Sequence, residues 1–334
     1  MIKVFLATLN PMLTLFLFMI LGFTLYKIKI LPEDSAKVMA KLETYLFVPA
    51  LSIASMLTVT PDKIATHATN IIFSGLSVGL AICLALLIAP LFVKDKQSYE
   101  RKVYNYALTF ANSGYLGDPV VLALFGLEGL AYYKIACIPV SIMCYGWGVP
   151  QLVPKGQSGQ GWKRFFPLPS ICTYVGLLLG LTGVGTFINT TPALKFATDG
   201  LEKLGDCMGP VAMLIAGITV ARFPFKPMLT NKKVYFASFL RLIVLPAIIL
   251  CVLFGVKELA NLVFGLHIDN LPLFLIFFMI ATPLGLNTVV FPEAYGGDPS
   301  IGASMTMISH TLCIITIPLI FALLCTLLGA PPVF

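Results

Sequence analysis

The chain has 334 residues, of which 58% are apolar and 11% are charged, and its mean hydropathy is +0.93. Soluble domains carry about a quarter of their residues as charged side chains, so this composition excludes a water-soluble globule and indicates an all-α integral membrane protein. The net charge of +7 comes from Lys and Arg in short loops between apolar runs, and no basic face suited to nucleic acid is visible.

Apolar runs of about 20 residues, each long enough to cross a hydrocarbon layer of roughly 30 Å as a helix, recur along the whole chain. They predict ten transmembrane helices. The expected spans are 9–27, 38–58, 66–92, 103–125, 129–152, 168–187, 203–221, 234–255, 271–293 and 300–328. The first run is too long for a signal peptide and has no small-residue cleavage site before Lys27, so we expect it to be retained.

The polar stretch 154–167 divides the chain into two halves, 1–153 and 168–334, and is predicted to be a cytoplasmic linker. Loops on the same side of the membrane as this linker hold fifteen Lys and Arg residues, against five on the other side. Cytoplasmic loops carry the excess of Lys and Arg. Both termini are therefore expected to be non-cytoplasmic.

The two halves contain an internal repeat. Pro11 and Pro49 of the first half are matched in the second half by Pro169 and Pro210, which lie at nearly the same separation along the chain. With five spans in each half, the second half enters the membrane from the opposite side, so the repeat is inverted. Inverted repeats are typical of secondary transporters.

Glycine, proline and polar residues cluster at the middle of two expected spans, the fourth and the ninth. They are Asn112, Gly114, Asp118 and Pro119 in one and Pro283, Asn287 and Thr288 in the other. Proline removes a backbone hydrogen bond, so within lipid it must be sheltered by protein or line a cavity. Matching breaks in inverted halves indicate a transport site near the midplane, where helix N-termini attract an anion. The alternative is a pair of ordinary proline kinks.

Three polar side chains in this region are candidates for chemistry. Asn112 and Asn287 can donate to and accept from a carboxylate, or can simply hold two helices together. Asp118 is the one carboxylate that the expected spans place well inside the membrane, where charges are usually functional. It is interpreted either as a proton-coupling group or as a helix cap.

Two further ionisable residues lie in expected spans. Arg241 is expected to snorkel to the cytoplasmic end of the eighth span, with a role in balancing an anion as the alternative. His310, in the tenth span, is expected to be a hydrogen-bonded packing residue, with a proton relay as the alternative.

Enzyme signatures are not visible in the sequence: it has no HExxH, P-loop, paired CxxC or GxSxG motif. The three histidines are scattered, and the eight cysteines show no metal-type spacing. We therefore expect no enzymatic activity, no cofactor and no metal.

Several motifs together resemble the auxin efflux carrier family of bacterial permeases. They are the span from Pro11 to Gly22, Leu31-Pro32-Glu33, Phe47-Val48-Pro49-Ala50-Leu51, the stretch from Asn112 to Pro119, and Ala294-Tyr295-Gly296-Gly297-Asp298. The resemblance covers essentially the whole chain. It implies a ten-helix fold like that of plant PIN auxin carriers and bile-acid symporters, with crossed, broken helices 4 and 9. Helices 1, 2, 6 and 7 would form a scaffold, and helices 3–5 and 8–10 a transport unit.

The resemblance also implies a site and a mode of action. Pro119 and Pro283 would mark the crossing, and Asn112 and Asn287 would bind substrate, with Gly114 and Thr288 beside them. Elevator-type alternating access, a homodimer and a place in the cell inner membrane are implied as well. Asp118 stands where many relatives are expected to carry an apolar residue.

The expected function is secondary transport of a small organic anion, either a malate-like dicarboxylate or an auxin-like aromatic carboxylate. The expected partners are that anion, the lipid bilayer, and a proton or sodium ion whose gradient drives the transport. One alternative is a sodium- or proton-coupled symporter or antiporter of the same fold that serves another substrate. A second alternative is a membrane enzyme or sensor that transports nothing.

Overall fold

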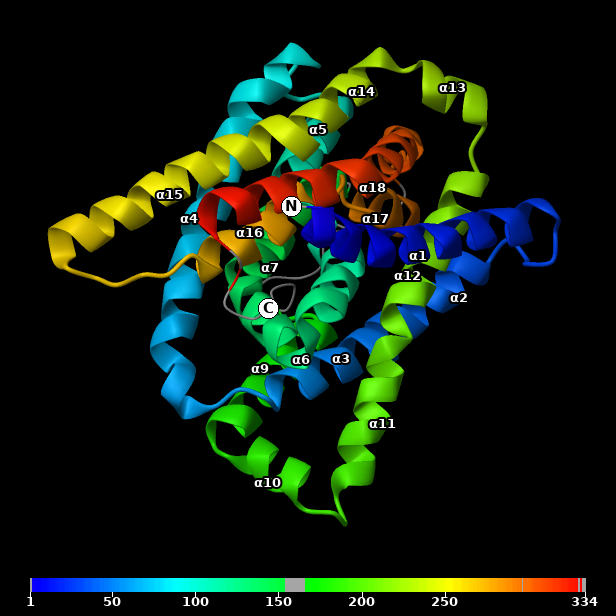
Figure 1. Cartoon of the computed structure of the whole chain (residues 1–334). Coiled ribbons are helices and arrows are strands. Elements are labelled where there is room, and N and C mark those ends of the chain that lie inside the picture. Colours follow the sequence, from blue (N-terminus) through cyan, green and yellow to red (C-terminus); the bar gives the residue numbers. More distant parts are fainter. Residues whose placement is uncertain (1, 154–165, 296, 330, 332–334) are drawn as a thin grey trace.

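The computed structural model describes residues 2–153, 166–295, 297–329 and 331 (Figure 1). Over these residues the chain forms helices and no β-strand, with one isolated bridge between Ala111 and Leu284. Residues 154–165 of the predicted linker, and Gly296 of the family motif, lie outside the described residues. The first half contains α1 (Ile2–Lys27), α2 (Ser35–Leu42), α3 (Val48–Met56), α4 (Ile64–Ile88), α5 (Tyr99–Thr109), α6 (Asp118–Ala136), α7 (Ile138–Met143) and α8 (Val149–Leu152).

The second half continues the same pattern of helices. It contains α9 (Leu168–Leu181), α10 (Val184–Thr190), α11 (Lys195–Asp206), α12 (Met208–Ala221), α13 (Phe225–Thr230), α14 (Lys232–Phe239), α15 (Leu245–Phe264), α16 (Leu271–Ala281), α17 (Asn287–Tyr295) and α18 (Ser300–Leu328). Short π-helical turns widen several of these helices, namely η1 (Glu43–Phe47), η4 (Ser113–Gly117), η5 (Cys144–Gly148) and η7 (Leu240–Val244).

Seven helical stretches in the described part of the chain are long and apolar enough to cross a membrane. They are Ile2–Lys27, Ser35–Met56, Pro61–Leu91, Ser113–Ala136, Lys195–Ala221, Lys232–Phe264 and Ser300–Leu328. The pair α9 and α10, bent by 78°, makes an eighth if it is taken as one span. The chain is therefore a multi-pass membrane protein. The expected fourth and fifth spans share Ser113–Ala136, and the expected ninth consists of α16 and α17.

The stretch Ser113–Ala136 is not one straight helix, because Gly126 has non-helical backbone angles with φ +67. A straight helix would separate Asp118 and Lys134 by about 24 Å at 1.5 Å per residue. Their side chains instead approach to 2.6 Å. The chain therefore folds back at Gly126 and forms a hairpin, which a residue with a Cβ atom would adopt only under strain.

The helices pack into two groups. The first group contains α1 to α3, α9, α11 and α12, in which α1 packs along α12 and α3 lies between α9 and α11 (Figure 1). Gly22 and Gly217 bring α1 and α12 close, since a Cβ atom on either would overlap the backbone of the other helix. Small residues serve this purpose at helix contacts in membranes.

The second group contains α4 to α8 and α14 to α18, and α16 lies at its core. Every residue of α16 is buried, which is typical of a helix that is apolar all round and surrounded by protein. Phe278 of α16 packs against Phe321 of α18 with tilted rings, whose centroids are 4.8 Å apart. The two groups meet where α18 packs on α1 and where α12 packs on η4.

Candidate functional site

Two segments of extended backbone meet inside the second group, and they fall in the two proline- and glycine-rich stretches. Helical geometry stops at Phe110 and resumes at Ser113, and the chain after α16 stays non-helical from Thr282 to Leu286. The two segments pair with each other, because the backbone N–H of Asn112 donates to the carbonyl of Pro283 at 2.8 Å. Buried irregular backbone is tolerated in a membrane protein when protein groups satisfy it in this way.

A polar cavity of about 200 Å³ opens beside these segments, at the contact between the two helix groups. The first group contributes hydroxyl-bearing residues to its wall, namely Thr44, Ser52, Ser170 and Thr173. The second group contributes the stretch 110–115 and further polar residues, namely Asp118, Lys134, Ser141, Tyr145 and Asn287. Drug-sized ligands occupy pockets of about 300–1,000 Å³, so this cavity suits a smaller molecule.

The predicted site residues divide into two sets. Asn112, Gly114, Asp118 and Asn287 line the cavity, whereas Pro119, Pro283 and Thr288 do not. Pro119 packs against Gly209 of α12, and Pro283 contributes only its carbonyl, to Asn112. The hydroxyl of Thr288 is buried and donates to the carbonyl of Gly285 at 2.9 Å.

Asn112 is held by a histidine from another helix. Its amide nitrogen lies 3.0 Å from Nε2 of His310, and Nδ1 of the same ring lies 2.8 Å from the carbonyl of Thr306. Since a carbonyl only accepts, Nδ1 carries the hydrogen, and in the neutral ring Nε2 accepts from the Asn112 amide. The histidine expected as a packing residue is thus the partner of a cavity side chain.

Asn287 has an equivalent partner. Its amide nitrogen donates to the hydroxyl of Tyr106 at 3.0 Å, and that hydroxyl lies 3.2 Å from the sulfur of Cys144. Both asparagines therefore make interhelical hydrogen bonds and line the cavity at the same time. Binding a substrate carboxylate and holding two helices together, the two roles considered from the sequence, therefore do not exclude each other.

Asp118 forms a buried ion pair that the sequence interpretation missed. One carboxylate oxygen lies 2.6 Å from the ammonium of Lys134, and the two side chains are 5% and 8% exposed. Asp118 is the first residue of α6, and the structure shows its side chain bonded to Lys134 instead of capping the helix. The available signal was Lys134 itself, a charge within the expected fifth span that required a partner.

The structure corrects one expectation about a buried charge and adds a second buried carboxylate. Arg241 does not snorkel: it is fully buried in η7, where one guanidinium nitrogen donates to the carbonyl of Leu108 at 3.2 Å. Asp118 is joined by a second buried carboxylate that the sequence analysis did not single out, because Glu43 in η1 is also fully buried, and neither of its oxygens forms a side-chain hydrogen bond. Neither Arg241 nor Glu43 lines the cavity.

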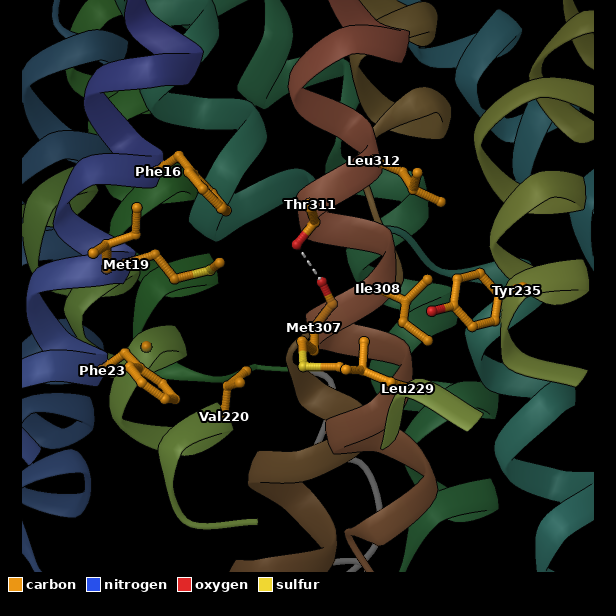
Figure 2. Close-up of a pocket in the computed structure, with 12 residues that line it drawn as sticks. Phe16, Met19, Phe23, Val220, Leu229, Tyr235, Met307, Ile308, Thr311 and Leu312 are labelled. Carbon is orange, nitrogen blue, oxygen red and sulfur yellow. Dashed lines mark hydrogen bonds between the residues drawn. The ribbon is translucent and has the colours of Figure 1, made fainter. Parts of the chain in front are cut away.

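A second pocket, of about 340 Å³, lies between α1 and α12 on one side and α14 and α18 on the other. Figure 2 shows Phe16, Met19 and Phe23 of α1 on one side of α18, and Ile308 beside Tyr235 on its other side. Among its described lining residues only Tyr235 and Thr311 carry side-chain oxygens, and the Thr311 hydroxyl is spent on the carbonyl of Met307 at 2.9 Å. Such a wall suits hydrocarbon and offers an anion no charged group.

Comparison with known proteins agrees with this picture. The sequence model of the family described as "Membrane transport protein" matches residues 7–161 and 160–321. An uncharacterized transporter of Methanocaldococcus jannaschii is 27% identical over 304 residues, which cover 87% of this chain and 90% of that protein. Both matches extend over the two halves of the chain.

Proposed function

The chain belongs to the membrane transport protein family, also known as the auxin efflux carrier family, and on that premise we propose that it is a secondary transporter of a small organic anion. The resemblance seen in the motifs is thereby confirmed, and the chain is a transporter and not an enzyme. The substrate class that we propose is a malate-like dicarboxylate or an auxin-like aromatic carboxylate.

The observation that carries this proposal is the composition of the polar cavity. Two amide side chains from separate broken segments, Asn112 and Asn287, meet one ammonium group, that of Lys134, in about 200 Å³. Amides and an ammonium supply the N–H donors that a carboxylate accepts. The small volume favours a compact acid over a large amphipathic molecule.

The finer architecture is part of the proposal. We infer ten spans in two inverted halves, 1–153 and 168–334, with crossed helices 4 and 9 marked by Pro119 and Pro283. The first helix group would be the scaffold and the second the transport unit, moving as an elevator. The pairing of Asn112 with Pro283 and the position of the cavity between the groups support this arrangement. A homodimer in the cell inner membrane, with both termini non-cytoplasmic, completes it.

Uptake into proteoliposomes tests the function. Radiolabelled malate and indole-3-acetate are offered to wild-type protein and to the Asn112→Ala/Asn287→Ala double variant, with and without an inward proton gradient. We expect saturable uptake by the wild type and its loss in the double variant. The matched control is Asn70→Ala, which removes a buried asparagine of α4 outside the cavity and is expected to preserve uptake.

The same assay distinguishes the proposed anion transporter from a cation-coupled carrier of the same fold that serves another substrate. If neither acid enters the vesicles under any proton or sodium gradient, the organic-anion proposal fails and a cation-coupled carrier of another substrate takes its place. Binding of a carboxylate without any uptake would instead favour a sensor.

Coupling to protons is proposed to involve Asp118. The Asp118→Asn variant keeps a side chain of the same size but cannot carry a proton as a carboxyl group does. We expect it to lose uptake driven by a pH gradient while exchange of internal for external substrate continues. Unchanged dependence on the gradient would make Asp118 a structural residue.

A further inference from the structure

Lys134 is the strongest anion-binding group in the cavity. Among the described lining residues no other side chain carries a positive charge. An ammonium has three N–H donors, and the structure gives that of Lys134 one hydrogen-bond partner, Asp118. Asn112 and Asn287 each already donate one amide N–H to a neighbouring side chain. The ammonium thus has the most capacity for an arriving carboxylate.

We propose that Lys134 is the primary substrate-binding residue and that Asp118 takes the place of the substrate carboxylate in the empty site. The inference rests on the proposed function, because it assumes that the cavity admits an organic anion. Asp118 and the substrate compete for one ammonium, which the geometry allows since both members of the pair line the cavity. A pair that served only to join the two arms of the Gly126 hairpin would not need to face it.

This competition links substrate binding to a proton. The empty cavity contains one negative and one positive charge, and an arriving carboxylate adds a second negative charge in a buried place. An uncompensated buried charge is strongly unfavourable. The charge is cancelled when Asp118, no longer held by Lys134, takes up one proton on its carboxylate, so that anion and proton move together.

The other groups around Asp118 do not offer an equivalent role. Tyr133 of α6 and Cys137, the residue after α6, lie near Asp118, and Tyr115 of η4 lines the same cavity. Phenol and thiol groups are ordinarily neutral near pH 7. Glu43 of η1 also lies near Asp118, but it does not line the cavity, and neither of its oxygens forms a side-chain hydrogen bond or ion pair within the described residues. A carboxyl group buried in this way is most cheaply kept neutral.

Calorimetric titration of purified protein in detergent micelles tests the proposal, with succinate and indole-3-acetate as probes. Removing the competing carboxylate in Asp118→Asn is expected to tighten binding of the acid about tenfold, since close charge pairs have large coupling energies. Lys134→Gln is expected to lose binding. The double variant Asp118→Asn/Lys134→Gln removes both charges at nearly constant size, and we expect it to be folded and not to bind.

The same titration in buffers of different ionisation enthalpy counts protons. We expect the wild-type protein to take up about one proton from the buffer for each acid that it binds. The Asp118→Asn variant is expected to take up none when it binds the acid. Glu43→Gln is the matched control, because it removes the neighbouring buried carboxyl without touching Lys134, and it should still take up the proton.

Several results would overturn the inference. Binding by Asp118→Asn that is no tighter than wild type, including no binding by any variant, contradicts competition for Lys134. Wild-type affinity in the double variant shows that the pair is only a structural link. Loss of proton uptake in Glu43→Gln assigns the proton to Glu43 instead. If any of these results is obtained while the wild type still transports the acid, the inference about Lys134 and Asp118 fails but the proposed function stands. Failure of the inference is thus distinguishable from failure of the proposed function.

Discussion

Gly117 and Gly114 occupy the same π-helical turn, but their surroundings differ. A Cβ atom on Gly117 would overlap the hydroxyl of Tyr133, whereas one on Gly114 would meet nothing within 4 Å. The Tyr133 hydroxyl donates to the carbonyl of Ser113 at 3.0 Å, just beside the broken segment. The absence of a side chain at Gly117 therefore allows the hydroxyl to support the break.

We predict that Gly117→Ala destabilises the protein by about 1–3 kcal/mol, since the added methyl group overpacks the site and displaces the Tyr133 hydroxyl from the part-buried carbonyl of Ser113. The measurement is the thermal unfolding midpoint of purified protein in detergent. Gly114→Ala, three residues earlier in the same turn, is the control and should melt with the wild type. Equal midpoints for the two variants would falsify the role of the Tyr133 contact.

His310 positions Asn112 and does not itself line the polar cavity. His310→Phe is expected to fill the space but leave the Asn112 amide without an acceptor, which costs about 1–3 kcal/mol for a buried polar group. Uptake kinetics should show a raised KM for the transported acid. His310→Gln, whose amide oxygen can accept, should restore part of the affinity, and His67→Phe on α4 should leave KM unchanged. A purely structural role would lower the amount of folded protein and leave KM unaltered in all three variants.

At the scale of the helices, the hairpin at Gly126 shapes the site, because it brings Lys134 back to Asp118. Gly126→Ala places a Cβ atom at φ +67, a conformation that costs an L-residue roughly 1–2 kcal/mol. We expect a lower thermal midpoint and weaker acid binding, measured on the same preparation. Gly79→Ala is the control, since it lies inside α4 with nothing near its Cβ position. Wild-type behaviour of Gly126→Ala would mean that the turn relaxes without moving Lys134.

The class of protein could be predicted from the sequence, because the hydropathy and length of each apolar run are read from consecutive residues and do not depend on tertiary contacts. The expected spans 9–27, 66–92 and 300–328 correspond to apolar helical stretches of the structure. The pairing of charges could not be predicted. Lys134 reaches Asp118 only because the chain reverses at Gly126, and the burial of Arg241 depends on a carbonyl of α5, 133 residues earlier.

The candidate site shows the same limit. Asn112 and Asn287 were predicted from residue type and position within interrupted spans, which are local properties. Their partners, His310 and Tyr106, lie 198 and 181 residues away along the chain. Residue type also cannot separate side chains that line the cavity from those that face away from it, which is why Thr288 was included although its hydroxyl is spent on Gly285.

At the scale of the whole molecule, the cavity lies between two helix groups, so any relative movement of the groups would change its access. The contact of Gly209 on α12 with Pro119 on α6 joins the first group to the second. It is close, because a Cβ atom at Gly209 would lie 2.9 Å from Cβ of Pro119. The contact of Gly205 on α11 with Leu51 on α3 lies within the first group, with a corresponding distance of 3.1 Å. These contacts provide a matched pair of positions for testing movement.

We predict that a disulfide between cysteines at positions 119 and 209 stops transport, because an elevator must separate its transport unit from its scaffold to carry the substrate across. The eight native cysteines are first replaced, and the pair Pro119→Cys/Gly209→Cys is compared in its oxidised and reduced forms. Disulfides join Cβ atoms about 3.5–4.5 Å apart, so both pairs need only a small shift. The oxidised Leu51→Cys/Gly205→Cys pair should transport normally, since it joins helices that move together. Uptake that continues with the 119–209 bond fully formed would mean that these two groups do not move past each other, and that access to the cavity changes through local motion of the broken segments.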